Sequence, residues 1–132
     1  MINAFYRRLF AVTSTLGAIG VIVGAFGAHF LKSRLPASDL DTIKTGVLYL
    51  FIHMLATLFV ISLSKQHSDS GWLRIAGITF ITGIVMFSGS LFIIGTQTLT
   101  GFPASAIGIV TPLGGLCFII GWISLIVYAI KG

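Results

Sequence analysis

The sequence is poor in charged side chains, which make up 8% of its 132 residues, and it contains only three acidic residues. Soluble domains usually carry about 25% charged residues. A surface with so few charges would precipitate in water but is compatible with lipid, and 56% of the residues are hydrophobic. The composition therefore excludes an ordinary soluble domain and predicts an integral membrane protein whose main partner is the lipid bilayer.

The scarcity of acids and cysteine also limits the chemistry. Asp39, Asp41 and Asp69 lie in polar segments between apolar runs, so no serine–histidine–carboxylate set is available within the membrane. Cys117 is the only cysteine, which excludes an intrachain disulfide. We therefore predict a protein that is not an enzyme and has no metal site and no cofactor. A surface hydrolase that uses Asp39, Asp41 and His29 stays open as an alternative.

Four long apolar runs alternate with short polar segments, and each run has about the ~20 residues that cross a bilayer. This pattern predicts an all-α membrane protein, residues 1–132 forming one four-transmembrane-helix bundle with short loops. The second helix is expected to begin near Ser38 and Asp39, which are suitable N-caps, before its span enters the hydrocarbon. Pro112 is expected to help start the fourth helix, with a kink as the alternative. The spans are expected at about residues 9–31, 44–64, 72–95 and 105–130.

Glycine is abundant in these runs and follows a helical spacing. Steps of three and four residues, which keep to one helix face, separate Gly17, Gly20, Gly24 and Gly27. A face without side chains lets another helix approach closely. We therefore predict that Gly24 and Gly27 face another helix, within the bundle or across an oligomer. For the same reason, Gly114, Gly115 and Gly121 of the fourth run are expected to allow close packing of their helix.

The basic residues predict the orientation in the membrane. Four spans put both termini on one side, and that side carries Arg7, Arg8, Lys65, Arg74 and Lys131. The opposite side carries Lys32, Arg34 and Lys44. The excess of basic residues favours cytoplasmic termini. Although the net charge is +5, no basic–aromatic patch or zinc-finger spacing indicates a nucleic-acid partner.

Four motifs occur in order along the chain: GAFGAH at 24–29, Tyr49-xxx-His53-xxx-Thr57, FSGSLF at 87–92, and TPLGG…GW across 111–122. Together they resemble the small membrane proteins of domain-of-unknown-function family 423, also called the transmembrane protein 256 family, over nearly the whole chain. The resemblance implies a four-span integral membrane protein, bacterial or organellar, with no settled biochemical activity. We expect a bacterial inner (plasma) membrane protein with both termini in the cytoplasm.

Polar residues from all four runs are expected at similar depth, in the outer half of the bilayer. Intramembrane ionisable residues are costly and by default face the bundle interior. We expect both histidines of this set to be neutral and hydrogen-bonded to its other members or to backbone carbonyls. Proton or ligand handling, and metal or haem ligation, are the alternatives. The candidate polar cluster consists of His29, His53, Tyr49, Ser88, Ser90 and Thr111.

Two functional hypotheses follow. The first is a non-enzymatic structural or accessory membrane protein that packs through its glycine faces against itself, as a homo-oligomer, or against a larger membrane complex. The alternative is an oligomeric small-solute or proton-coupled carrier that uses His29, His53, Ser88 and Thr111 in the outer leaflet. Because four short helices rarely enclose a path and no acidic residue lies at that depth, the carrier has less support.

Overall fold

The computed structural model describes residues 3–66 and 70–131. Within these ranges all assigned elements are helical, and four segments are long and apolar enough to cross a membrane. The long segments are α1 (Ala4–Leu31), α2 (Ala37–Gln66), the continuous helix of α3 (Gly71–Gly83), η1 (Ile84–Ser88) and α4 (Gly89–Gly95), and α6 (Val110–Lys131). The connection from α4 to α6 contains α5 (Gln97–Thr100) and η2 (Ala104–Ala106). The predicted all-α membrane class is confirmed.

The second helix begins slightly earlier than its predicted caps. Its first residue is Ala37, and the carbonyl of Pro36 accepts hydrogen bonds from the N–H groups of Asp39 and Leu40. Ser38 and Asp39 therefore lie inside the first turn, so the prediction that they cap the helix is wrong. The backbone before the helix is set by the proline, which suits the start of a helix.

The fourth helix begins later than predicted, at Val110 instead of residue 105. Gly101 takes a φ of 70°, a left-handed conformation that suits glycine, and this residue ends α5. The chain then makes a turn of 3₁₀-helix before α6. Pro112 is the third residue of α6, in the first turn, where a backbone N–H has no acceptor within the helix. The proline therefore costs no helical hydrogen bond and helps start the helix as expected.

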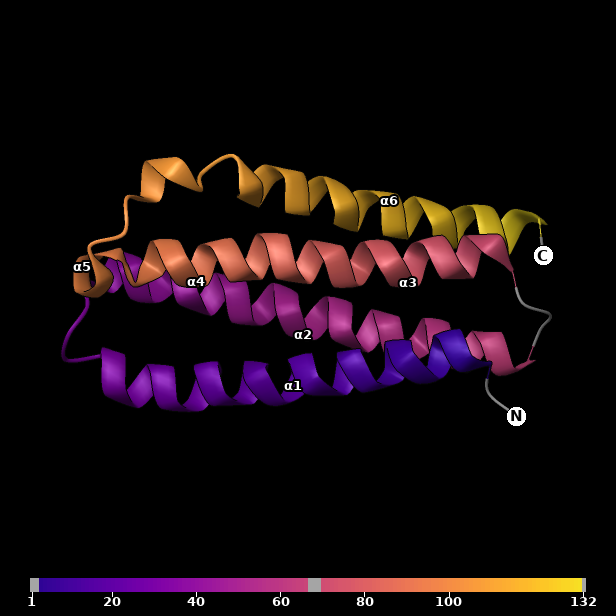
Figure 1. Cartoon of the computed structure of the whole chain (residues 1–132), viewed down its shortest axis with the longest axis horizontal. Coiled ribbons are helices and arrows are strands. Elements are labelled where there is room, and N and C mark those ends of the chain that lie inside the picture. The colour runs from indigo at the N-terminus through magenta and orange to yellow at the C-terminus, as the bar shows by residue number, and fades with distance from the viewer. Residues whose placement is uncertain (1–2, 67–69, 132) are drawn as a thin grey trace.

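The long helices run antiparallel and lie side by side in the order α1, α2, α3–α4 and α6, with both described ends of the chain at one end of the molecule (Figure 1). The most extensive packing joins α3 to α6, and α1 packs mainly on α2. The helix α3–η1–α4 therefore lies between α2 and α6, whereas α1 lies at the outer edge, next to α2.

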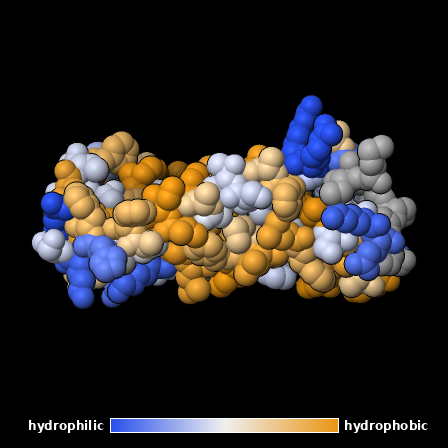
Figure 2. Space-filling view, turned by 90° about the horizontal axis from the view of Figure 1, so that it is seen from below, coloured by the Kyte–Doolittle hydropathy of each residue, from blue (hydrophilic) through white to orange (hydrophobic). Residues whose placement is uncertain are grey.

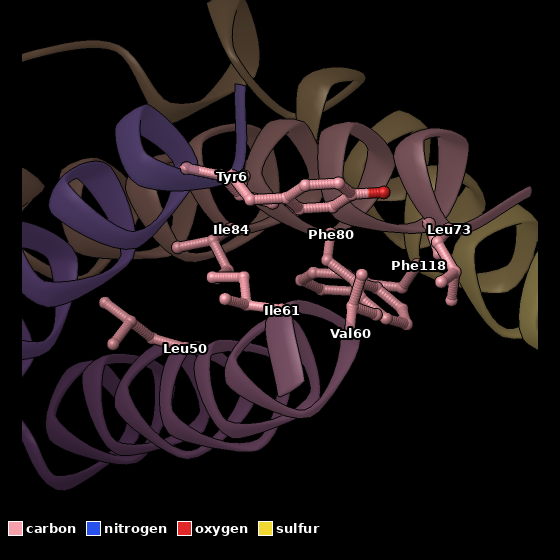
Figure 3. Packing of buried hydrophobic residues seen from close by; sticks show 10 residues of the cluster. Tyr6, Leu50, Val60, Ile61, Leu73, Phe80, Ile84 and Phe118 are labelled. Carbon is pink, nitrogen blue, oxygen red and sulfur yellow. The ribbon is translucent and has the colours of Figure 1, made fainter. Parts of the chain in front are cut away.

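Buried apolar side chains from all four long segments meet in one core. Leu9 of α1 and Leu50 of α2 belong to it, as do Phe80 of α3 and Phe118 of α6. Figure 3 shows Phe80, Phe118 and Val60 gathered between the ribbons of their helices. The outer surface is also apolar over the middle of the molecule, whereas hydrophilic residues gather at both ends (Figure 2). This distribution matches a bilayer, in which the lipid-facing surface is as apolar as the interior.

The glycine stripe of α1 lies against α2 over most of its length. Added Cβ atoms at Gly17, Gly20 and Gly24 would contact side chains of α2. At Gly27 an added Cβ would contact only side chains of α1 itself. Gly27 therefore faces no other helix in the described part of the chain, and only the oligomer part of its prediction stays open.

The three predicted packing glycines of α6 differ in how closely the third membrane segment approaches them. An added Cβ at Gly114 would overlap the backbone nitrogen of Phe87, and one at Gly121 would overlap the ring of Phe80. At Gly115 the nearest atom, in the Phe87 ring, would be 3.9 Å away, which is an ordinary van der Waals contact. Two of the three predicted packing glycines of α6 thus lie where the helices approach most closely.

Candidate functional site

His53 lies near the middle of α2 and is only 4% exposed. Its Nδ1 is 2.8 Å from the carbonyl oxygen of Tyr49, and the indole Nε1 of Trp122 is 3.2 Å from its Nε2. An indole nitrogen only donates, so Nε2 accepts that hydrogen bond. We infer that Nδ1 carries the proton and donates to the Tyr49 carbonyl. A neutral imidazole therefore satisfies both of its nitrogens with protein partners.

Aromatic rings of α3 and α6 enclose this imidazole. The Phe118 ring stacks on it with centroids 3.5 Å apart and an interplanar angle of 7°. The centroids of Phe80 and Trp122 lie 5.5 Å and 6.0 Å from that of His53. Phe118 and Trp122 are four residues apart, so they share one face of α6. The imidazole–indole pair thus joins α2 to α6 inside an apolar shell.

A second set of polar side chains lies at η1 and the start of α4. The Ser88 hydroxyl donates to the carbonyl of Gly46 in α2, at 2.7 Å. The Ser90 hydroxyl lies 2.6 Å from that of Thr111 in α6 and donates to the carbonyl of Phe87, so Thr111 donates to Ser90. These bonds connect the third membrane segment to both of its neighbours.

The π-helical segment η1 is where α6 approaches the third segment most closely. Its Phe87 backbone faces Gly114, and an added Cβ at Gly83, the residue before η1, would lie 3.1 Å from the Gly114 carbonyl oxygen. π-helical turns are rare and often occur at functional sites. The sequence reading missed this segment, although Ser–Gly pairs such as Ser88–Gly89 are a known signal for an irregular helix.

The structure brings the predicted polar residues together only in part. His53 bonds to the backbone of Tyr49, and Ser90 pairs with Thr111, but these are two separate sets. His29 is exposed at the end of α1, and no residue that the structure describes bonds to its imidazole. The single cluster with His29 as a member is thus corrected.

His53 lies near the middle of its helix. Because α2 extends from Ala37 to Gln66, His53 is ~24 Å from one end and ~20 Å from the other at ~1.5 Å per residue. Its depth in the bilayer stays a prediction. Trp122 was missed as its partner, although a tryptophan N–H inside a membrane requires an acceptor.

The described residues contain no group of three or more His, Cys, Asp or Glu side chains close enough to hold a metal ion. They also contain no buried side-chain nitrogen or oxygen without a hydrogen-bond partner. In the described residues, the site holds three helices together with neutral hydrogen bonds and stacked rings.

Four apolar helices with this interior define a small polytopic α-helical membrane protein. The chain belongs to the family described as "Protein of unknown function (DUF423)", whose model matches residues 23–115, and this confirms the resemblance seen in the sequence. No solved structure matches the chain.

Its relatives are likewise named as membrane proteins. The UPF0382 membrane protein YwdK of Bacillus subtilis is 38% identical over 125 residues, which cover 94% of this chain and 98% of the relative. The UPF0382 inner membrane protein YgdD of Escherichia coli K12 is 36% identical over 126 residues, covering 96% and 90%. A UPF0382 membrane protein of Haemophilus influenzae is 38% identical over 120 residues, covering 90% of each chain. The likeness thus extends over nearly the whole length of these proteins.

Proposed function

We propose that the protein is a non-enzymatic accessory protein of the bacterial inner membrane, which assembles with a second copy or with a larger membrane complex. The observation that carries this proposal is the use of the buried polar side chains. In the described residues each buried polar side-chain atom has a hydrogen-bond partner. Thr13, Thr57 and Ser124 bond to carbonyls of their own helices, whereas Ser88 and His53 connect helices. Such an interior stabilises a scaffold.

The outer end of α1 supports assembly. Gly27 lines two apolar grooves of about 590 Å³ and 320 Å³, and both also have lining residues from α2. Phe26 and Phe30 of the same turn are exposed. Helices associate in lipid through close packing at small residues, so this turn of α1 suits contact with a helix from outside the chain.

The test of assembly compares two glycine variants in lipid nanodiscs and mild detergent. Gly27→Leu adds bulk at the proposed contact, whereas Gly89→Leu adds the same bulk where nothing lies within 4 Å. Native mass spectrometry should show a stoichiometric second copy or membrane partner that Gly27→Leu loses and Gly89→Leu keeps. A parent protein that is monomeric and without a partner in both media would contradict the proposal.

The orientation with both termini in the cytoplasm is part of the proposal. The end of the molecule with the termini has five basic residues, Arg7, Arg8, Lys65, Arg74 and Lys131, against three at the other end, Lys32, Arg34 and Lys44. The name of the E. coli relative supports an inner membrane location. Since short loops rich in Lys and Arg stay in the cytoplasm, this excess favours cytoplasmic termini.

Cysteine labelling tests the orientation on a Cys117→Ser background. A membrane-impermeant maleimide added to intact cells should label Ser38→Cys and should reach Gln66→Cys only after the membrane is opened. The opposite result would place the termini outside.

A further inference from the structure

We propose that a groove between α2 and α6 binds a planar, lipid-soluble carbonyl compound of the quinone class. This site is separate from the assembly surface on α1 and does not depend on the proposed accessory role. The groove has a volume of about 590 Å³ and opens beside His53 and Trp122. Ligand sites of proteins typically have volumes of about 300–1,000 Å³ and are lined by apolar and aromatic side chains with a few polar groups.

The lining of the groove suits a flat ring system. The rings of Tyr49, Phe87, Phe118 and Trp122 line it, together with the imidazole of His53. His53 and Phe118 are buried and form its base, whereas Tyr49 and Trp122 are 38% and 43% exposed. Aromatic rings prefer offset-stacked or edge-to-face contacts with one another, and this lining offers both kinds of surface to a planar ligand.

The hydroxyl of Tyr49 supplies the polar contact that the ligand must satisfy. No group within residues 3–66 and 70–131 forms a hydrogen bond with this hydroxyl. Tyr49 lies within the predicted second span, residues 44–64, and the hydrocarbon of a bilayer holds no water for its hydroxyl. A phenol that lacks a partner in hydrocarbon is costly, and a ligand carbonyl would accept its hydrogen bond.

The absence of charge in the groove selects among membrane-soluble ligands. None of the described residues that line it is Lys, Arg, Asp or Glu. The groove therefore offers no charged partner to a phospholipid headgroup. A quinone ring is planar, uncharged and soluble in hydrocarbon, and its carbonyl oxygens only accept hydrogen bonds, which complements the phenol donor.

The experiment uses the intact protein in detergent and menadione as the probe. The chain has two tryptophans, so Trp72→Phe leaves Trp122 on the groove as the only one, and Trp122→Phe leaves Trp72. Menadione should quench the fluorescence of Trp122 along a saturable curve and that of Trp72 along a linear one. Linear quenching of the same slope in both variants would mean that menadione only partitions into the micelle, and would overturn the proposal.

Two substitutions in the Trp72→Phe background test the contacts. Tyr49→Phe keeps the ring and removes the hydroxyl, so the affinity for menadione should fall about threefold to tenfold, whereas Tyr128→Phe should leave it unchanged. Gly115→Leu fills the groove from a position with room for a side chain and should lower the affinity by more than about tenfold. Unchanged affinity in the folded Gly115→Leu variant would contradict the site.

A matched hydrocarbon tests the carbonyl. 2-Methylnaphthalene has the ring system of menadione without its oxygens. Its affinity, measured by competition with menadione, should be about threefold to tenfold lower than that of menadione. This difference should vanish in Tyr49→Phe, because the hydroxyl no longer distinguishes the two ligands. Equal binding of both compounds to the parent would indicate a site for acyl chains or other hydrocarbons and would refute the quinone assignment.

Discussion

The two helix contacts that contain most of the packing glycines differ in how closely the helix backbones approach each other. Between the third membrane segment and α6, Gly114 lies directly against the backbone of Phe87 in η1. Between α1 and α2, the atoms nearest to an added Cβ at Gly17 and Gly24 are side-chain ends of Met54 and Val47, at 2.6 Å and 3.3 Å. A flexible side chain can move away and a backbone cannot. The glycines thus produce a rigid contact at α6 and an adaptable one at α1.

Hydrogen bonds add to the difference. Trp122 bonds to His53, Thr111 to Ser90, and Ser88 to the backbone of α2, and all three bonds lie among α2, the third segment and α6. Polar contacts in membranes are worth about 0.6 kcal/mol on average. The part of the bundle around η1 therefore combines close backbone packing with polar contacts, and we expect it to be the most sensitive to substitution.

The largest effect is expected at Gly114. Gly114→Ala places a methyl group onto the Phe87 backbone and should lower the free energy of unfolding by about 3 kcal/mol or more, through overpacking. The neighbouring Gly115→Ala is the control and should change it by less than about 0.5 kcal/mol. SDS titration followed by far-UV circular dichroism measures both. Equal stability of the two variants would remove the distinction between the rigid and the adaptable contact.

The next largest effect is expected at His53. His53→Asn takes the acceptor from the Trp122 N–H and leaves space beside Phe118, so it should cost roughly 1–3 kcal/mol without preventing folding. His29→Gln should change stability by less than about 0.5 kcal/mol, because His29 is exposed at the end of α1. The same titration compares them, and an equal loss in both would show that His29 has a structural role after all.

The histidines also carry a prediction about bound groups. Gently purified protein is expected to contain no stoichiometric metal or haem, since both nitrogens of His53 already have protein partners. Elemental analysis and a visible absorption spectrum measure this. One equivalent of metal, or a Soret band, that disappears in His53→Asn would make this histidine a ligand.

A smaller effect is expected in α1. Gly24→Leu should cost about 1–2 kcal/mol, because Val47 must move to make room. Gly27→Leu should leave the stability of the isolated chain within about 0.5 kcal/mol of the parent, since its added atoms enter a groove. Thermal unfolding in detergent, at a concentration where the protein is monomeric, separates these values. A large loss at Gly27 under these conditions would mean that α1 packs more closely than its grooves suggest.

The smallest effect is expected at Ser88. Ser88→Ala removes the bond to the Gly46 carbonyl and should cost about 0.6 kcal/mol, with a maximum near 1.7 kcal/mol. Thr15→Ala is the control, because the Thr15 hydroxyl is exposed and bonds only within its own helix. Unfolding curves of the two variants that coincide would indicate that the η1 contact depends on packing alone.

Several features could be predicted from the sequence because they depend on neighbours along the chain. Apolar runs of the right length predict helices that cross a bilayer, and the proline at position 112 predicts a helix start. The spacing of Tyr49 and His53 predicts that they share a helix face, and the structure joins them by a hydrogen bond. Helix ends were less accurate, because hydropathy marks where a helix enters lipid and not where its hydrogen bonds begin.

By itself, then, the sequence determined the class of protein, the number of helices and which residues are small enough for close packing, since composition and periodicity are properties of local chain segments. Only the tertiary structure decided that Trp122 meets His53 across 69 positions of sequence, that Gly114 meets a backbone, and that Gly27 meets no other helix. These outcomes depend on how each helix is rotated and shifted against its neighbours. Rotation and register are set by the packing of all side chains at once, so no local pattern contains them.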